Sequence, residues 1–227
     1  MPRTLDPAAH AIKRDAFIDA AQRLIQAKGY EQMSIQEVLD ETGASRGAFY
    51  HYFASKALLL DAVVERMMEN VTGILESMVA DPDMRALEKL RRVFEDVGRL
   101  KHERTDLLVE LLRVWLSDEN AIVRDKFRQS FTRMWTPLLS QIIRQGQGEG
   151  VFGPGAPADV AHVVVSLLQG ANETAVRLFF ARQEGKVSYE AVEHLLGAYV
   201  DAMERVLGLP AASLSPIDPV ILRQWYA

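Results

Sequence analysis

Residues 34–56, SIQEVLDETGASRGAFYHYFASK, predict two short helices joined by a tight turn. Ser34 and Glu37 have the spacing of a capping box, in which the serine hydroxyl accepts from the Glu37 N–H and the carboxylate accepts from the Ser34 N–H. Gly43 follows the first helix and lets the chain turn sharply. Ser45 then occupies the position of an N-cap for the second helix. The segment therefore predicts a helix-turn-helix.

The second helix is expected to have an aromatic side and an exposed side. Phe49, Tyr52 and Phe53 recur at helical spacing, and we interpret them as core. An α-helix fits the major groove of B-form DNA, with its first residues next to the base edges. Arg46 lies at that leading end and suits a guanine contact, while Tyr50 can donate to a phosphate. This joint placement favours DNA binding over a plain solvated surface.

The segment Gly47–Leu60, together with Ser34, Gly43 and the Lys28-Gly29-Tyr30 end of the preceding helix, resembles the tetracycline-repressor (TetR) family of bacterial transcriptional regulators. The similarity covers the first quarter of the chain. It implies a dimeric repressor with a three-helix N-terminal DNA reader and a helical C-terminal domain that binds a small-molecule effector. It also implies a DNA-facing set: Ser34, Gln36, Arg46, Gly47, Ala48, Tyr50, His51, Tyr52 and Lys56. For His51, a plain helix-surface histidine remains the alternative.

The charge of the chain limits how such a reader can hold DNA. The formal net charge is −5 and the pI is near 5.6. From Met1 to Lys56, seven basic residues balance seven acidic ones, so the rest of the chain carries the whole excess. A neutral reader cannot bind tightly through bulk charge. Affinity for DNA must instead come from a few specifically positioned cationic side chains and from the presence of two DNA-reading domains in a dimer.

Composition indicates an ordinary globular protein. The 227 residues are 48% hydrophobic, which is enough to bury a substantial core. The absence of cysteine excludes disulfides and thiolate metal sites, and it suits a reducing cytoplasm. The N-terminal residues lack the apolar segment of a signal peptide, and no apolar run is long enough to span a bilayer. We therefore expect a cytoplasmic location and no membrane partner.

Helical periodicity runs along nearly the whole chain and predicts an all-α fold. We expect a helix-turn-helix DNA-binding domain at 7–56 and an effector-binding and dimerisation domain at 57–227. The helices expected outside the motif are 7–28, a long one from Ser55 to near Asp81, then about 84–100, 105–116, 120–145, 157–182 and 188–207, with a short turn near 219–225. The long helix after Ser55 is the expected mechanical link between the domains.

The last two long helices carry apolar stripes that suit an intersubunit four-helix bundle. The candidate dimer residues are Val164, Leu167, Ala171, Ala175, Leu178, Leu195, Leu196, Tyr199 and Met203. The alternative is that both stripes pack within one subunit. The family resemblance favours the dimer.

The middle helices carry aromatic and methionine side chains that can shape an apolar effector site. The candidate pocket consists of Leu112, Trp115, Phe131, Met134, Trp135, Gln169 and Asn172. Such apolar side chains are more often core, and the polar ones can equally face water. We hypothesise that effector binding favours a dimer whose readers are misplaced for the groove, so that the operator is released.

A helical metalloenzyme or ligand-binding bundle with an incidental helix-turn-helix is the competing hypothesis. Asp159 with His162, and Glu190 with His194, have spacings that can place metal ligands on a helix face. They fall mostly off the apolar stripes, which favours surface pairs. Residues 148–153 match G-x-G-x-x-G, but no strand precedes them, and we interpret them as a loop. No catalytic set and no cofactor follow from the sequence, and we expect no enzyme activity.

Overall fold

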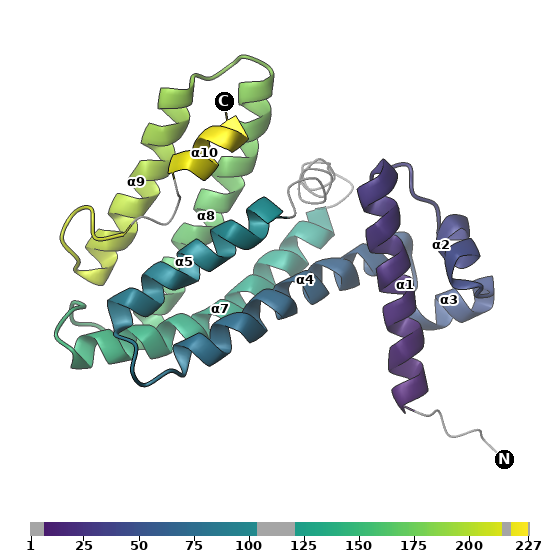
Figure 1. The fold of residues 1–227 in the computed structure, drawn as a ribbon, viewed down its shortest axis with the longest axis horizontal. Helices are drawn as coiled ribbons and strands as arrows, with labels where there is room; N and C mark the ends of the chain where they lie inside the picture. The colour runs from purple at the N-terminus through teal and green to yellow at the C-terminus, as the bar shows by residue number, and fades with distance from the viewer. Residues whose placement is uncertain (1–6, 104–120, 215–218, 227) are drawn as a thin grey trace. The chain divides into compact units, whose positions relative to one another are not determined.

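A computed structural model of the chain describes residues 7–103, 121–214 and 219–226. All regular elements within these ranges are helices, which confirms the predicted all-α class (Figure 1). Contacts divide the described helices into two compact units. The first unit contains α1 (Pro7–Lys28), α2 (Ile35–Thr42), α3 (Arg46–Tyr52), α4 (Lys56–Val79) as far as Glu69, and the start of α7 (Ala121–Gly148) as far as Phe127.

The predicted caps define the helices of the first unit. Gly29, at φ 84°, ends α1 and donates its N–H to the Ile25 carbonyl. Both hydrogen bonds of the predicted capping box are present at Ser34. Gly43 has a left-handed φ of 60°, and it ends α2 through its N–H to the Leu39 carbonyl. The Ser45 hydroxyl accepts from the Ala48 N–H at 3.2 Å and so starts α3.

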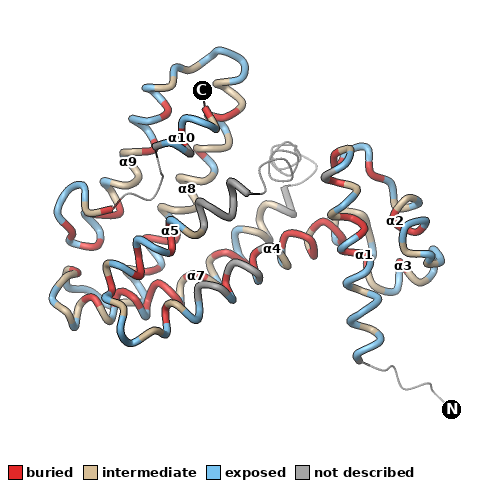
Figure 2. The backbone as a smooth tube through the Cα atoms, viewed as in Figure 1, coloured by how far each residue is buried: buried red, intermediate tan, exposed pale blue. Residues whose placement is uncertain are grey.

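Three phenylalanines hold α3 against α1. Phe17 of α1 and Phe49 of α3 have ring centroids 5.5 Å apart and planes at 89°. Phe53, directly after α3, meets the same Phe17 ring at 6.2 Å and 90°. These are edge-to-face contacts, which aromatic pairs prefer. Phe49 and Phe53 are 0% and 4% exposed, which confirms their interpretation as core. In Figure 2 the buried backbone of this unit, drawn in red, lies largely along α1 and the start of α4.

The second unit contains the rest of α4 and α7 together with α5 (Ala86–Glu103), α8 (Pro157–Gln183), α9 (Tyr189–Leu207) and α10 (Pro219–Tyr226). These helices lie where the periodicity placed them, while the helix predicted at 105–116 lies outside the described residues. The G-x-G-x-x-G match begins at the last residue of α7 and continues as a loop, as predicted. No described helix is long and apolar enough to cross a membrane.

Charged side chains secure the junction between α4 and α5. Lys89 is only 2% exposed, and its Nζ donates to the Val79 carbonyl at 2.6 Å. A cation at this point satisfies a free carbonyl at the end of α4. Glu149, just after α7, accepts from the Ala86 N–H at 3.2 Å and so caps the start of α5.

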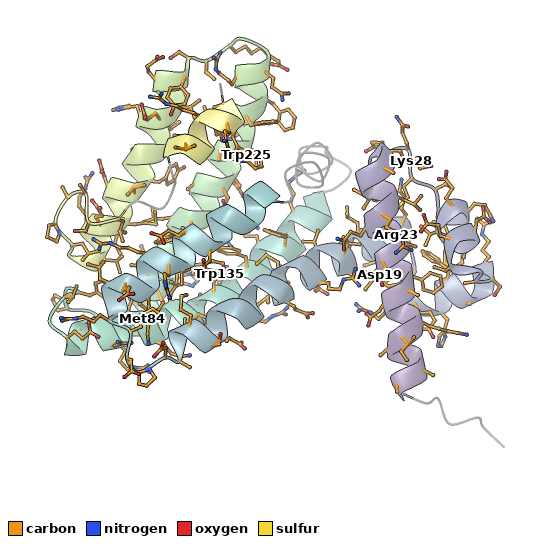
Figure 3. The ribbon with its side chains drawn as sticks, in the orientation of Figure 1. Asp19, Arg23, Lys28, Met84, Trp135 and Trp225 are labelled. Atoms are coloured by element: carbon orange, nitrogen blue, oxygen red, sulfur yellow. The ribbon has the colours of Figure 1, made fainter. Side chains whose placement is uncertain are left out.

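The helices α8 and α9 pack against each other, and α10 lies across both (Figure 1). Tyr199 of α9 covers Gly170 of α8, and its hydroxyl is 3.0 Å from the Thr174 hydroxyl. The Tyr226 hydroxyl of α10 donates to the Ala175 carbonyl at 2.8 Å. Trp225, labelled in Figure 3, lies 6.0 Å from the ring of Phe179. One face of the α8–α9 pair is therefore already covered within the chain.

We predict that Phe49→Ala destabilises the first unit by about 3–5 kcal/mol, because it leaves a cavity beside Phe17. Urea unfolding followed by circular dichroism measures the change. Ile12→Ala is the control, since Ile12 is 70% exposed and its truncation should change little. Equal stability of the two variants would contradict the assignment of Phe49 as the residue that anchors α3.

Candidate nucleic-acid interface

The side of α3 opposite the phenylalanines is exposed. Arg46, Gly47, Tyr50 and His51 form this surface, which we call the α3 strip. The Tyr50 ring is 45% exposed and rests edge-on against Phe49, with centroids 5.4 Å apart. The Arg46 guanidinium lies 6.0 Å from the centroid of the Tyr50 ring. The aromatic core thus orients a tyrosine hydroxyl and a guanidinium toward solvent at the leading end of the helix.

Ala48 and Tyr52 lie at the margin of the α3 strip, and both are half-buried. The Tyr52 ring is 5.6 Å from Phe17, so much of its surface is used in packing, as predicted for this residue. Its other neighbour is His10 of α1, whose ring centroid is 4.5 Å away. Only part of Tyr52 is therefore open to a partner.

Ser34 and Gln36, the candidates on α2, are engaged in local hydrogen bonds. The Ser34 backbone N–H and hydroxyl both donate to a Glu37 carboxylate oxygen, at 2.9 and 2.8 Å. The Gln36 amide donates to Asp40 Oδ1 at 2.9 Å, one turn further along the helix. Both side chains are exposed, so they can exchange these partners for phosphate oxygens without unfolding the helix.

The Glu37 carboxylate has a strongly lowered pKa. A hydrogen bond from Lys28 is the largest cause, and the Ser34 backbone and hydroxyl donors add to it. Together they lower the pKa from 4.5 to about 2. These donors favour the ionised form. The carboxylate is therefore both the second half of the capping box and an ion-pair partner for the end of α1.

Lys56 does not project freely into solvent. Its Nζ lies 4.2 Å from the centroid of the Tyr30 ring and 3.5 Å from the Glu31 carbonyl oxygen. Burial lowers the pKa of this amine, and the charges of Glu31 and Glu37 partly offset the effect. The side chain thus ties the start of α4 to the turn after α1, a structural role that the sequence did not indicate.

His10 is a candidate that the sequence analysis missed. Besides its contact with Tyr52, its ring lies 5.8 Å from that of His51, in an edge-on arrangement. It therefore places a second imidazole at the end of α3. No local spacing signals this, because His10 lies on α1 and meets α3 only through the packing of Phe17.

Ion pairs neutralise several cations of the first unit. Arg23 pairs with Glu41 at 3.0 Å and Arg66 with Asp19 at 2.8 Å, while Lys28 pairs with Glu37. Arg46 has no ion pair with any residue that the structure describes, and its only charge contact there is the Tyr50 ring. The net charge of residues 1–56 is zero, yet the pairing of other cations leaves Arg46 available on the α3 strip.

Comparison with known proteins agrees with this geometry. The family model for bacterial regulatory proteins of the tetR family matches residues 17–63, which run from the middle of α1 into α4. Residues 17–63 form a TetR-family domain. YerO of Bacillus subtilis, an uncharacterized HTH-type transcriptional regulator, is 27% identical over 210 residues, covering 90% of this chain and 68% of YerO.

Solved structures share the fold of this chain. A tetR-family transcriptional regulator from Pectobacterium atrosepticum superposes with a TM-score of 0.63 at 21% identity, covering 92% of this chain and 98% of that one. The structure of RolR in complex with resorcinol gives a TM-score of 0.56 at 20% identity, covering 97% and 96%. The chain described here is a DNA-binding transcriptional regulator.

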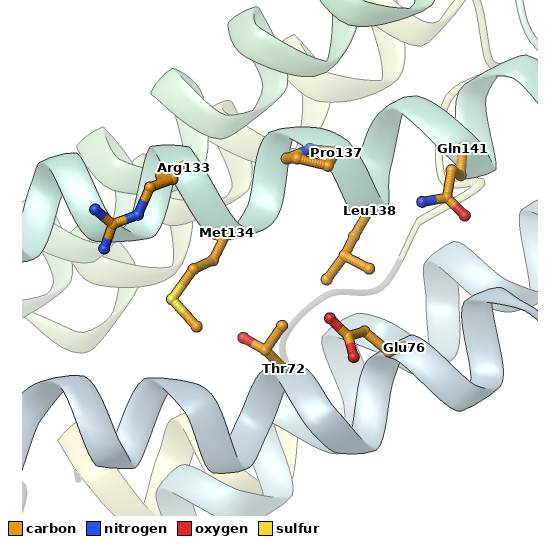
Figure 4. A pocket seen from close by; sticks show the side chains of 7 residues that line it. All are labelled: Thr72, Glu76, Arg133, Met134, Pro137, Leu138 and Gln141. Atoms are coloured by element: carbon orange, nitrogen blue, oxygen red, sulfur yellow. The ribbon is translucent and has the colours of Figure 1, made fainter.

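The second unit of this regulator contains a hollow of about 460 Å³ between α4 and α7 (Figure 4). Its lining residues are Thr72 and Glu76 from α4, and Arg133, Met134, Pro137, Leu138 and Gln141 from α7. Met134 is the predicted pocket residue that lines it. The sequence missed the others because they are polar or lie outside the aromatic cluster.

The remaining predicted pocket residues have other surroundings. Phe131 and Trp135 are buried and stack with centroids 4.8 Å apart, so they act as core beside the hollow. The Gln169 amide donates to the Arg128 carbonyl and the Thr132 hydroxyl, which ties α8 to α7. Asn172 is half-buried on α8. Leu112 and Trp115 lie outside the described residues.

The candidate dimer residues divide into two groups. Val164, Leu196 and Met203 are 1%, 4% and 2% exposed within the single chain. They therefore pack inside the subunit, as the alternative held, and offer no surface to a partner. Leu195 is 43% exposed. The half-buried members are Leu167, Ala171, Ala175, Leu178 and Tyr199.

The residues of the competing metal hypothesis lie on the surface. Asp159, His162, Glu190 and His194 are all exposed on α8 and α9. Within the described ranges, no three or more His, Cys, Asp or Glu side chains are grouped to hold a metal ion. YerO and the Pectobacterium atrosepticum protein are both named as transcriptional regulators.

We predict that Glu37→Gln lowers stability at neutral pH and that this deficit shrinks in acid. The lowered pKa means that the carboxylate stabilises the fold above pH 4.5, and that this contribution is lost as the pH falls toward about 2. Urea midpoints of both proteins, measured in steps down that range, test the expectation. A deficit that stays constant with pH would show that the carboxylate charge contributes nothing.

Proposed function

We propose that this regulator is a homodimeric cytoplasmic repressor that binds operator DNA through the α3 strip and leaves it when a small-molecule effector binds. The observation that carries the proposal is the exposed α3 strip on a helix fixed by the phenylalanine core. Residues 7–56 form the reading domain, and residues 57–227 form the effector-binding and dimerisation domain. The DNA-facing set is the one predicted from the sequence, with His10 added.

Within the major groove, the residues of the strip have different roles. Arg46 donates to a guanine edge, because it lies at the leading end of α3 without a carboxylate partner among the described residues. Gly47, which has open space where a Cβ would be, lets the helix approach the bases closely. Tyr50 and His51 donate to phosphates on one side, and Ser34 and Gln36 do so from α2. Lys56 reaches phosphate by leaving the Tyr30 ring.

Dimerisation uses the exposed side of α8 and α9. Val163 of α8 is 45% exposed, and Leu195 and Val206 of α9 are 43% and 37% exposed. Leu195 and Val206 are eleven positions apart in the printed sequence, or three helical turns, so they share one side of α9. Covering these side chains with a second copy removes apolar surface from water. It also places two neutral readers on one operator, which multiplies their weak individual affinity.

Release of the operator requires a ligand that prefers one shape of the dimer. Thr72 and Glu76 line the hollow on the same helix whose first residue, Lys56, follows α3. A ligand in the hollow therefore contacts the helix that carries the reader. If it binds better when α4 is displaced, it shifts the population toward dimers whose readers no longer match the groove.

We predict that Arg46→Ala weakens binding to the DNA upstream of its own gene by about 1–3 kcal/mol, the value of a bidentate guanine contact. Its thermal midpoint should match that of the wild type, since the guanidinium is exposed. Gel shifts or fluorescence anisotropy measure the affinity. Arg144→Ala removes an exposed arginine from α7 and is the charge-matched control. Full retention of affinity in Arg46→Ala would mean that the interface is misassigned.

We predict that Leu195→Glu converts the dimer to monomers and weakens operator binding, because it places a charge in an apolar interface. Sedimentation velocity measures the assembly state. The control is Val220→Glu, which makes the same kind of change at a 62% exposed position on α10. A dimer that persists in Leu195→Glu but dissociates in Val220→Glu would locate the interface on α10 instead.

A further inference from the structure

The hollow between α4 and α7 has an apolar floor and a polar rim. Leu138 is 7% exposed, and Met134 and Pro137 extend the apolar surface along α7. Figure 4 shows the Thr72 and Glu76 side chains pointing from α4 toward this floor, with the Gln141 amide beyond Leu138. The volume of about 460 Å³ is that of a small-molecule site.

Hydrogen-bond acceptors dominate the rim near Glu76. Its carboxylate is exposed and brings a negative charge. Pro137 lies inside α7 and has no N–H, so the Arg133 carbonyl lacks its usual helical donor four residues on. The Gln141 amide oxygen and the Thr72 hydroxyl oxygen are further acceptors. Thr72 and Gln141 can also donate, so the Glu76 carboxylate, which can only accept, is the side chain that favours a donor on the ligand.

Arg133 is the basic residue among those that line the hollow, and its guanidinium does not point toward Glu76. Arg133 Nη2 donates to the Ser130 hydroxyl at 3.3 Å, one turn back along α7. Figure 4 shows its guanidinium beyond Met134, away from Glu76. It therefore does not neutralise the Glu76 carboxylate, and the two ends of the hollow differ in charge.

We propose that this hollow binds an organic cation, with a protonated amine at Glu76 and an apolar body over Leu138, Met134 and Pro137. The ammonium group donates to the Glu76 carboxylate and to the Gln141 amide oxygen, which are charge-assisted contacts. The inference rests on the proposed function, because it names the class of effector that acts through α4.

Three probes with one body and different head groups test the charge preference: phenylbutylamine, phenylbutanol and phenylbutyrate. Their affinities for the full chain are measured by isothermal titration calorimetry. The amine should bind most tightly, and Glu76→Gln should weaken it by about tenfold, the value of a hydrogen bond to a charged group. Glu65→Gln removes the same charge from an exposed position on α4 outside the hollow, and it should leave the affinity unchanged.

Operator affinity is measured separately, without any probe, so that the two proposals fail independently. A chain that binds operator but takes phenylbutyrate as tightly as the amine, or takes none of the probes, overturns the organic-cation proposal alone. An amine affinity unchanged by Glu76→Gln also overturns it. A chain that binds the amine through Glu76 but never binds DNA overturns the proposed function.

Discussion

The packing of Phe17 against Phe49 and Phe53 is the contact on which the DNA-facing surface depends. The helix α3 has only seven residues, too few to persist in water by itself. Its shape comes from the Ser45 cap and from the buried ring edges that fix its rotation about its own axis. Because the aromatic side of α3 is held against the core, the α3 strip on the opposite side faces solvent. The orientation of the surface that we propose reads the major groove is therefore set by the hydrophobic packing beneath it.

Local pairing of charge explains how a neutral reader can still present a cation. The carboxylates of Glu41, Glu37 and Asp19 each pair with a basic residue of α1 or α4. These pairs stabilise the arrangement of the helices only modestly, since all are at least partly exposed. They also give these acidic groups basic partners other than Arg46. Counting charges along the chain cannot reveal this, because the partners lie far apart in sequence.

The sequence predicted those features that depend on residues only a few positions apart in the chain. The capping box at Ser34, the turn at Gly43 and the cap at Ser45 each depend on local spacing, and each is present. The helix periods likewise placed α7, α8 and α9 to within a few residues. An apolar stripe, however, does not say which neighbour covers it, so Val164 and Phe131 could not be assigned to core or surface. Nor could spacing place His10 beside Tyr52 or Glu76 opposite Leu138, because helix packing creates both.

The contact between Lys56 Nζ and the Tyr30 ring bears on the proposed phosphate contact of Lys56. In the proposed complex, Lys56 contacts a phosphate only after its amine leaves the Tyr30 ring and the Glu31 carbonyl. The free energy of the Lys56–Tyr30 contact is lost in this exchange, so it subtracts from the free energy that the phosphate contact contributes. Under this proposal, a substitution at Tyr30 changes operator affinity through Lys56, although Tyr30 is not among the residues proposed to contact DNA.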